Sequence, residues 1–184
     1  MRASEADILV IPGLGGSGRD HWQSRWEAKI PAVRRVVQAD WENPGLAAWR
    51  DRIIEEVERA ARPVILVAHS LGVLAAVDAA PFLAKEESSG KVKGAFLVAP
   101  PSANVLAGLD ALDPAFLTVP GGSLPFPSPS DRESQRSFCG LCRKRGFGAR
   151  AWRGADRRGH INSESGHGPW PEGLMRFAGF LKTL

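Results

Sequence analysis

The stretch Pro63-Val-Ile-Leu-Val-Ala-His-Ser-Leu-Gly72 decides the fold of this 184-residue chain. Its apolar first half predicts a buried parallel strand, and residues 71–83 have the apolar spacing of a helix. Ser70 therefore falls in a strand-to-helix turn, the setting of a nucleophile elbow, with Ala68 in the place of the first glycine of G-x-S-x-G. The alternative is that Ser70 only caps the helix. We interpret Ser70 as a nucleophile, because the elbow exposes its Oγ above the sheet edge and the helix N-terminus favours an oxyanion there.

Apolar runs alternate with amphipathic segments along the rest of the chain. We expect strands at 7–12, 36–39, 63–68 and 93–99, and helices at 20–30, 46–61, 71–83 and 172–184. Asp20 is the expected cap of the first helix. The last helix is expected to bury Leu174, Phe177, Ala178 and Leu181. This alternation predicts a single α/β domain over residues 1–184, with a mostly parallel central sheet and helices on both faces.

The composition is that of an ordinary globular domain, with 43% hydrophobic and 24% charged residues. No apolar run approaches the roughly 18–20 residues that span a bilayer, and the polar N-terminus lacks the regions of a signal peptide. Two cysteines do not make a disulfide scaffold in a chain of this size. We therefore predict a cytoplasmic protein with no membrane partner.

The net charge of +4 belongs to one segment. Residues 129–159 hold nine Lys or Arg against three acids, whereas the rest of the chain is slightly acidic. The segment has no scaffold that reads a nucleic-acid groove, so we predict no nucleic-acid partner. Its Cys139-Gly-Leu-Cys142 lacks a second ligand pair, so we predict no metal. Zinc binding, a redox pair and an anion-binding surface remain weaker alternatives.

Five motifs together resemble a known family. They are Ile11-Pro-Gly-Leu-Gly-Gly-Ser-Gly-Arg-Asp-His-Trp22, Asp40-Trp-Glu-Asn-Pro44, Ala68-His-Ser-Leu-Gly72, Gly159-His-Ile-Asn-Ser163 and Gly166-His-Gly-Pro-Trp-Pro-Glu-Gly173. They are similar to those of the small serine α/β-hydrolases related to retinoblastoma-binding protein nine, over residues 7–128 and 159–184. The resemblance implies a compact α/β-hydrolase fold, a Ser-acid-His triad, and esterase or peptidase-like activity.

The base and the oxyanion donors follow from this topology. The triad histidine of an α/β-hydrolase comes late in the chain, before the last helix, which favours His160 and leaves His167 as the competitor. The N–H of Leu71, directly after the nucleophile, and that of Leu14 in the Gly-rich turn are the expected oxyanion hole. That turn lacks the glycine spacing of a nucleotide-binding loop, so no cofactor is expected.

The sequence does not contain the motif that carries the triad acid in this family. The family carries a Ser-x-Asn-Asp-Pro-aromatic motif in this region, and this sequence has Pro129-Ser-Asp-Arg-Glu-Ser-Gln-Arg-Ser-Phe-Cys-Gly140 instead. Residues 131–140 can be back-translated into a set of allowed codons. When this nucleotide sequence is read from its second nucleotide, it encodes Ile-Ala-Ser-Arg-Asn-Asp-Pro-Phe-Ala, which contains the motif. We interpret residues 129–158 as a frame-shifted segment, a hypothesis that codons unable to encode Asn-Asp-Pro would refute. With the residues as printed, Asp131 is the nearest acid.

The sequence thus predicts a serine hydrolase, a monomer or weak dimer, that cleaves a small ester or amide through an acyl-enzyme on Ser70. The alternative is a pseudo-hydrolase, a binding protein that keeps the fold and has lost its triad acid.

Overall fold

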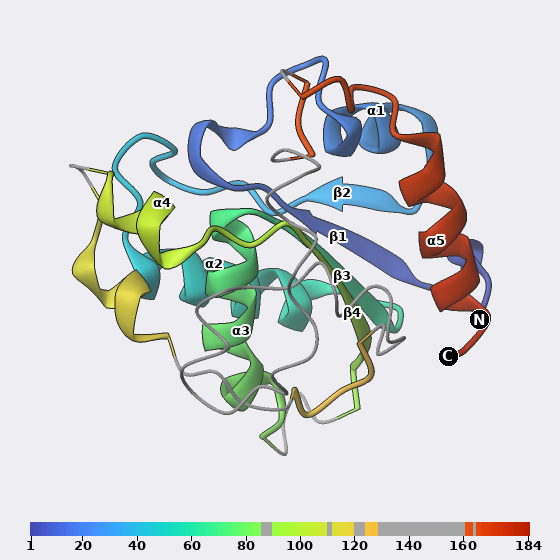
Figure 1. Cartoon of the computed structure of the whole chain (residues 1–184). Helices are drawn as coiled ribbons and strands as arrows, with labels where there is room; N and C mark the ends of the chain where they lie inside the picture. Colours follow the sequence, from blue (N-terminus) through green and yellow to red (C-terminus); the bar gives the residue numbers. More distant parts are fainter. Residues whose placement is uncertain (86–89, 110–111, 120–123, 129–160, 164) are drawn as a thin grey trace.

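Four parallel strands form the sheet in the computed structural model, which describes residues 1–85, 90–109, 112–119, 124–128, 161–163 and 165–184. The strands are β1 (Asp7–Ile11), β2 (Val33–Arg35), β3 (Val64–His69) and β4 (Val92–Val98), in the order β2-β1-β3-β4 (Figure 1). Ile11 of β1 pairs with Ala68 of β3, so the two central strands end side by side. The loops that follow them therefore emerge next to each other, where open parallel sheets hold their ligands.

Helices cover both faces of this sheet, which confirms the predicted fold class. α1 (Trp22–Lys29) and α5 (Pro171–Leu181) lie on one face, and α2 (Leu46–Arg59) and α3 (Leu71–Leu83) on the other (Figure 1). α4 (Ala103–Ala107) follows β4. Three short 3-10 helices complete the described elements: η1 (Ala3–Glu5), η2 (Leu14–Gly16) and η3 (Pro114–Thr118).

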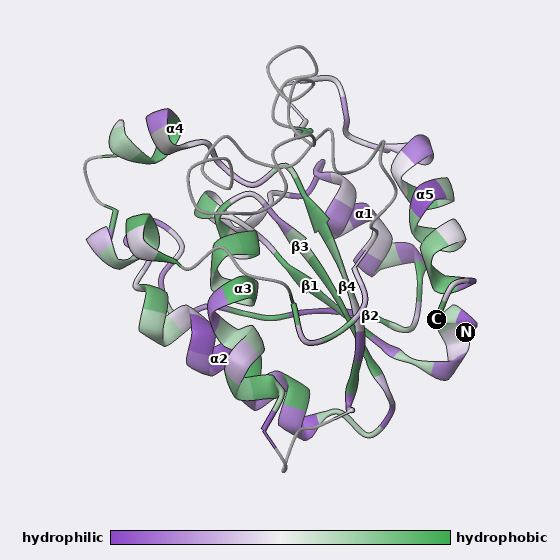
Figure 2. Ribbon diagram, turned by 60° about the horizontal axis from the view of Figure 1, so that its bottom comes forward, coloured by the Kyte–Doolittle hydropathy of each residue, from purple (hydrophilic) through white to green (hydrophobic). Residues whose placement is uncertain are grey.

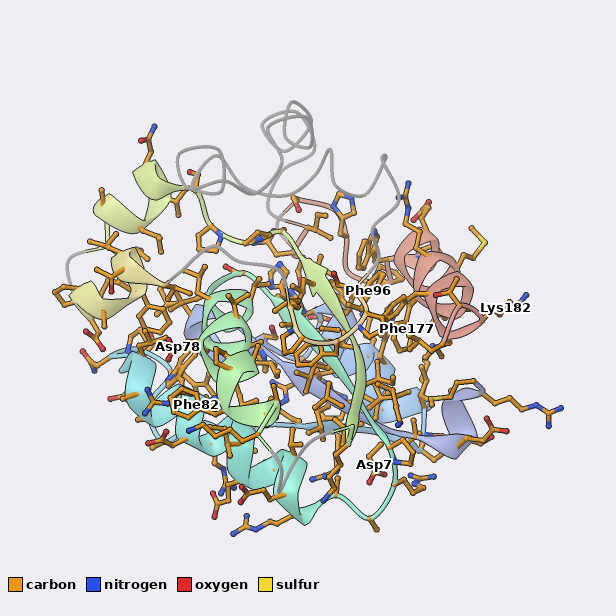
Figure 3. The ribbon with its side chains drawn as sticks, turned by 90° about the horizontal axis from the view of Figure 1, so that it is seen from below. Asp7, Asp78, Phe82, Phe96, Phe177 and Lys182 are labelled. Atoms are coloured by element: carbon orange, nitrogen blue, oxygen red, sulfur yellow. The ribbon has the colours of Figure 1, made fainter. Side chains whose placement is uncertain are left out.

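Each face of the sheet has its own apolar core, and the helices turn their apolar sides toward it (Figure 2). Trp49 and Ile53 of α2 are buried on one face. On the other, Phe96 of β4 and Phe177 of α5 meet edge to face with ring centroids 5.4 Å apart (Figure 3). β3 is buried along its whole length, which explains its continuous apolar sequence.

Three local predictions were wrong. The second strand is Val33–Arg35 rather than residues 36–39, because pairing with β1 begins at Val33 opposite Ile8. The cap of α1 is His21, whose Nδ1 accepts the N–H of Gln23; Asp20 instead pairs with Arg25.

The buried side of α5 is also rotated from the predicted one. Phe180 and Leu181 are buried together with Phe177, whereas Leu174 is 40% exposed and Ala178 is exposed. The ring of Phe180 packs against Phe96 of β4, at 6.2 Å between centroids, and this contact with the sheet sets the orientation of the helix.

Some predictions fall outside the described residues, namely those on Asp131, Cys139, Cys142 and His160 and on the frame-shifted segment 129–158. The single-domain prediction likewise stays a prediction. Within the described ranges, none of the helices combines the length and the apolar character that crossing a membrane requires.

Candidate active site

Ser70 occupies the strained turn that the sequence predicts. It lies between β3 and α3 with φ 53° and ψ −127°, a conformation that L-residues rarely adopt. The turn is held on both sides, since Ser70 N–H donates to the Val98 carbonyl at 3.0 Å and the Ser70 carbonyl accepts from Val73 at 3.0 Å. Ser70 is only 7% exposed. A serine held by backbone hydrogen bonds in such a strained conformation is typical of a nucleophile elbow.

Gly13, directly after β1, lies against the Ser70 side chain. A Cβ built on Gly13 would lie 2.8 Å from Ser70 Cβ, 3.1 Å from Ser70 Oγ and 3.1 Å from the backbone nitrogen of Leu71. Leu71 is the first residue of α3, so its N–H has no acceptor within the helix. The absent side chain therefore leaves a small space that both the hydroxyl and a backbone donor border, at hydrogen-bonding distance from each.

Gly72 lets α3 begin close to the end of β1. A Cβ on Gly72 would lie 2.5 Å from the Ile11 carbonyl oxygen and would also collide with the Pro12 carbonyl. Both obstacles are backbone, which has no room to move inside a packed sheet. The missing side chain at Gly72 thus allows the strand-to-helix turn at Ser70 to approach the loop that follows β1.

The Gly-rich loop after Gly13 is tightly folded. Leu14 begins η2, and Gly15, Gly16 and Ser17 follow with φ values of 71°, 72° and 56°. Trp41 supports the loop from outside, accepting the Gly15 N–H on its carbonyl at 3.1 Å and placing its indole against Gly16. The structure therefore brings Ser70, Leu71 and the start of the Leu14 turn together, with the Leu14 side chain 41% exposed.

Two histidines and a tryptophan pack together next to the Ser70 turn. The rings of His21 and His69 lie 4.8 Å apart between centroids, and Trp22 meets His69 edge to face at 5.9 Å. Both histidines are buried, at 5% and 3% exposed. His69 therefore packs against His21 and against Trp22 of α1. No sequence pattern identified His21 as its partner.

The chain after His160 is anchored to this same cluster. Trp22 Nε1 donates to the carbonyl of Ile161 at 3.0 Å, and Ile161 has φ 52°. His160 and Asp131 themselves lie outside the described residues. The competitor His167 is half-buried in a turn closed on itself, with its Nδ1 3.2 Å from Ser165 Oγ and its N–H donating to the Asn162 carbonyl at 3.0 Å.

Two carboxylates, those of Asp40 and Asp113, accept hydrogen bonds from backbone N–H groups in the segments near the site. The N–H groups of Asn43 and Glu42 donate to Asp40 and lower its pKa, which shapes the turn that carries Trp41. The N–H groups of Ala115 and Leu46 lower the pKa of Asp113. Among the described residues, no cluster of three or more His, Cys, Asp or Glu could hold a metal ion.

Comparisons with known proteins support a serine hydrolase with this fold. A family model described as serine hydrolase matches residues 8–179. Among solved structures, a Pectobacterium atrosepticum protein described as a YdeN-like hydrolase is 28% identical with a TM-score of 0.71, covering 98% of this chain and 93% of that one. A metagenomic carboxyl esterase, MGS0156, is more distant, at 15% identity and a TM-score of 0.45, covering 70% of this chain and 41% of that one. No curated protein matches.

Proposed function

The chain belongs to the serine hydrolase family, and we propose that it cleaves a small ester or amide through an acyl-enzyme on Ser70. The observation that carries the proposal is the strained Ser70 turn, with Gly13 leaving open the space between the hydroxyl and the Leu71 N–H. We further propose, on the five motifs quoted above, that the chain is related to the small hydrolases that resemble retinoblastoma-binding protein nine.

The proposed chemistry has two halves. Ser70 Oγ attacks the carbonyl carbon of the substrate while His160 takes the hydroxyl proton, and the N–H groups of Leu71 and Leu14 hold the resulting oxyanion. Collapse of this intermediate breaks the ester or amide bond, and His160 returns the proton to the leaving alcohol or amine. Water then attacks the acyl-enzyme by the same route and releases a carboxylic acid. Asp131, with the residues as printed, is the candidate that orients His160.

Labelling with a fluorophosphonate tests the nucleophile. We expect the wild-type chain to be labelled and both Ser70→Ala and His160→Ala to lose the label. His167→Ala is the matched control for the base, and Ser102→Ala, whose hydroxyl caps α4, is the control for the serine; both should label normally. A label that survives in Ser70→Ala would contradict the proposal.

A second candidate function is a pseudo-hydrolase that binds the substrate without turnover. It is favoured by the absence of the Asn-Asp-Pro motif from residues 129–140. Loss of an orienting carboxylate costs on the order of 10⁴ in turnover while the nucleophile stays in place. Sequencing the gene across residues 129–158 separates the two candidates, because a shifted frame that restores Asn-Asp-Pro restores the triad acid.

A further inference from the structure

We infer that Arg35 is a positioning residue that holds the Gly-rich loop in the shape required for the oxyanion hole. The inference rests on the proposed function. Arg35 is the last residue of β2, and its side chain is only 17% exposed. It lies behind the loop rather than at Ser70, so it acts through the loop and not on the substrate.

The guanidinium of Arg35 donates to two parts of the structure, helix α1 and the Gly-rich loop. Nε donates to Glu27 on α1 at 3.0 Å, and Nη2 donates to Ser24 Oγ at 2.7 Å. Nη1 donates to two carbonyls of the loop, those of Gly16 and of Ser17, the latter at 3.2 Å. The planar guanidinium suits this task because it offers several donors in fixed directions, whereas a lysine ammonium acts as a single point charge.

Neighbouring side chains tie the same end of the loop. Ser24 Oγ donates to the Ser17 carbonyl at 2.7 Å, so that carbonyl accepts from both Ser24 and Arg35. Ser17 Oγ donates to Gln23 Oε1 at 2.9 Å. Gln23 is fully buried, and its Nε2 donates to the carbonyl of Ile11, the last residue of β1, and to that of Val67 within β3.

Leu14 is thereby bracketed between two fixed points. On one side, Gly13 lies against Ser70. On the other, the carbonyls of Gly16 and Ser17 are fixed by Arg35. A glycine-rich loop without such anchors samples many backbone conformations, and an oxyanion hole is effective only when its donors are already oriented. Fixing the far end of the loop therefore fixes the Leu14 N–H that we propose as the second donor.

The matched control is Arg34, the preceding residue of the same strand. Its guanidinium pairs with the carboxylate of Glu56 and donates to the Glu56 backbone carbonyl at 3.2 Å. Glu56 belongs to α2, on the other face of the sheet from α1. Arg34→Met removes one ion pair and one carbonyl contact, and Arg35→Met removes one ion pair together with the contacts to two loop carbonyls and to Ser24. Only Arg35→Met releases the Gly-rich loop.

The experiment compares kcat and KM for p-nitrophenyl acetate, the fluorophosphonate labelling rate, and hydrogen exchange of residues 12–18. We expect Arg35→Met to lower kcat and the labelling rate by about 10- to 100-fold with little change in KM, and to speed exchange of the loop. Arg34→Met should stay within about twofold of the wild type. Arg35→Lys should recover part of the loss, because one donor still reaches the loop.

Ser24→Ala is a second variant that removes one hydroxyl and leaves the ion pair intact. It should lower kcat by about tenfold or less and also speed exchange of residues 12–18. A folded Arg35→Met with wild-type kcat, an equal loss in Arg34→Met, or a Ser24→Ala with unchanged kcat and exchange would each overturn the inference. A wild-type chain that is not labelled would instead overturn the proposed function, and this inference with it.

Discussion

The substitution Gly13→Ala adds one methyl group next to Ser70. We expect it to lower the hydrolysis rate strongly while the chain stays folded. The Cβ of Gly13→Ala would lie 3.1 Å from Leu71 N and 3.1 Å from Ser70 Oγ. That is the distance at which an oxygen would accept a hydrogen bond from the same nitrogen. The methyl therefore occupies the space of the proposed oxyanion and blocks the Leu71 donor.

The expected loss is large in rate and moderate in stability. Removing one oxyanion donor costs about 10² to 10³ in kcat, or about 2.7–4 kcal/mol of transition-state stabilisation. The contact of 2.8 Å with Ser70 Cβ forces a small shift, an overpacking cost of about 1–3 kcal/mol in the free energy of unfolding. Since domains are typically stable by about 5–15 kcal/mol, Gly13→Ala should remain folded and lose most of its activity.

Gly18→Ala provides the control within the same loop. A Cβ on Gly18 meets no described atom within 4 Å, so this variant should keep both kcat and thermal stability. The assay is steady-state hydrolysis of p-nitrophenyl acetate, with thermal unfolding followed by circular dichroism. A folded Gly13→Ala whose kcat stays within threefold or so of the wild type would refute the assignment of Leu71 to the oxyanion hole.

Three further predictions follow from the same geometry. Ser70→Gly should abolish labelling yet raise the free energy of unfolding by about 1 kcal/mol relative to Ser70→Ala, because glycine adopts φ 53° without strain; equal urea midpoints would contradict this. Gly72→Ala should lower the free energy of unfolding by at least about 1–3 kcal/mol, because its Cβ would lie 2.5 Å from the Ile11 carbonyl; a wild-type urea midpoint would contradict this. Hydrogen bonds from Ala115 and Leu46 lower the pKa of Asp113, so its stabilising contribution is present above the ordinary value of 3.8 and is lost as the pH falls through the lowered value. Unfolding curves of Asp113→Asn and the wild type should therefore differ near neutral pH and converge below pH 3.8, and a constant difference would exclude this linkage.

The parts of the fold that could be predicted are those with a local cause. β1 and β3 are buried on both faces, so their sequences are continuous apolar runs, with Gly13 shortly after β1 and Gly72 shortly after β3. The strand-to-helix turn at Ser70 follows from the same pattern, because a buried strand leads directly into Ser70 and a helix begins after it.

The parts that could not be predicted depend on contacts between distant residues. β2 contains two arginines, which weaken its strand pattern, yet both find carboxylates on neighbouring helices: Arg34 on α2 and Arg35 on α1. Residues 36–39, which include two adjacent valines, have a more strand-like sequence, so the sequence predicts the strand there instead. Similarly, nothing in the Gly-rich loop reveals that Gly13 contacts Ser70, because that contact exists only once β1 and β3 are paired.

In the proposed site, the nucleophile and the oxyanion donors come from one part of the chain, and the base and the acid come from another. Damage to one part can therefore be told apart from damage to the other. Ser70, Leu71, the Gly-rich loop and its anchor Arg35 all lie within residues 13–71, whose contacts are made by β1, β2, β3 and α1. His160 and the acid come from the later segment, which rejoins this unit at Ile161 through Trp22. Stabilisation of an oxyanion requires only the first half, whereas deprotonation of Ser70 requires the second. A lesion confined to residues 129–158 should therefore slow labelling and turnover at Ser70 without altering hydrogen exchange of residues 12–18, whereas loss of Arg35 should alter all three.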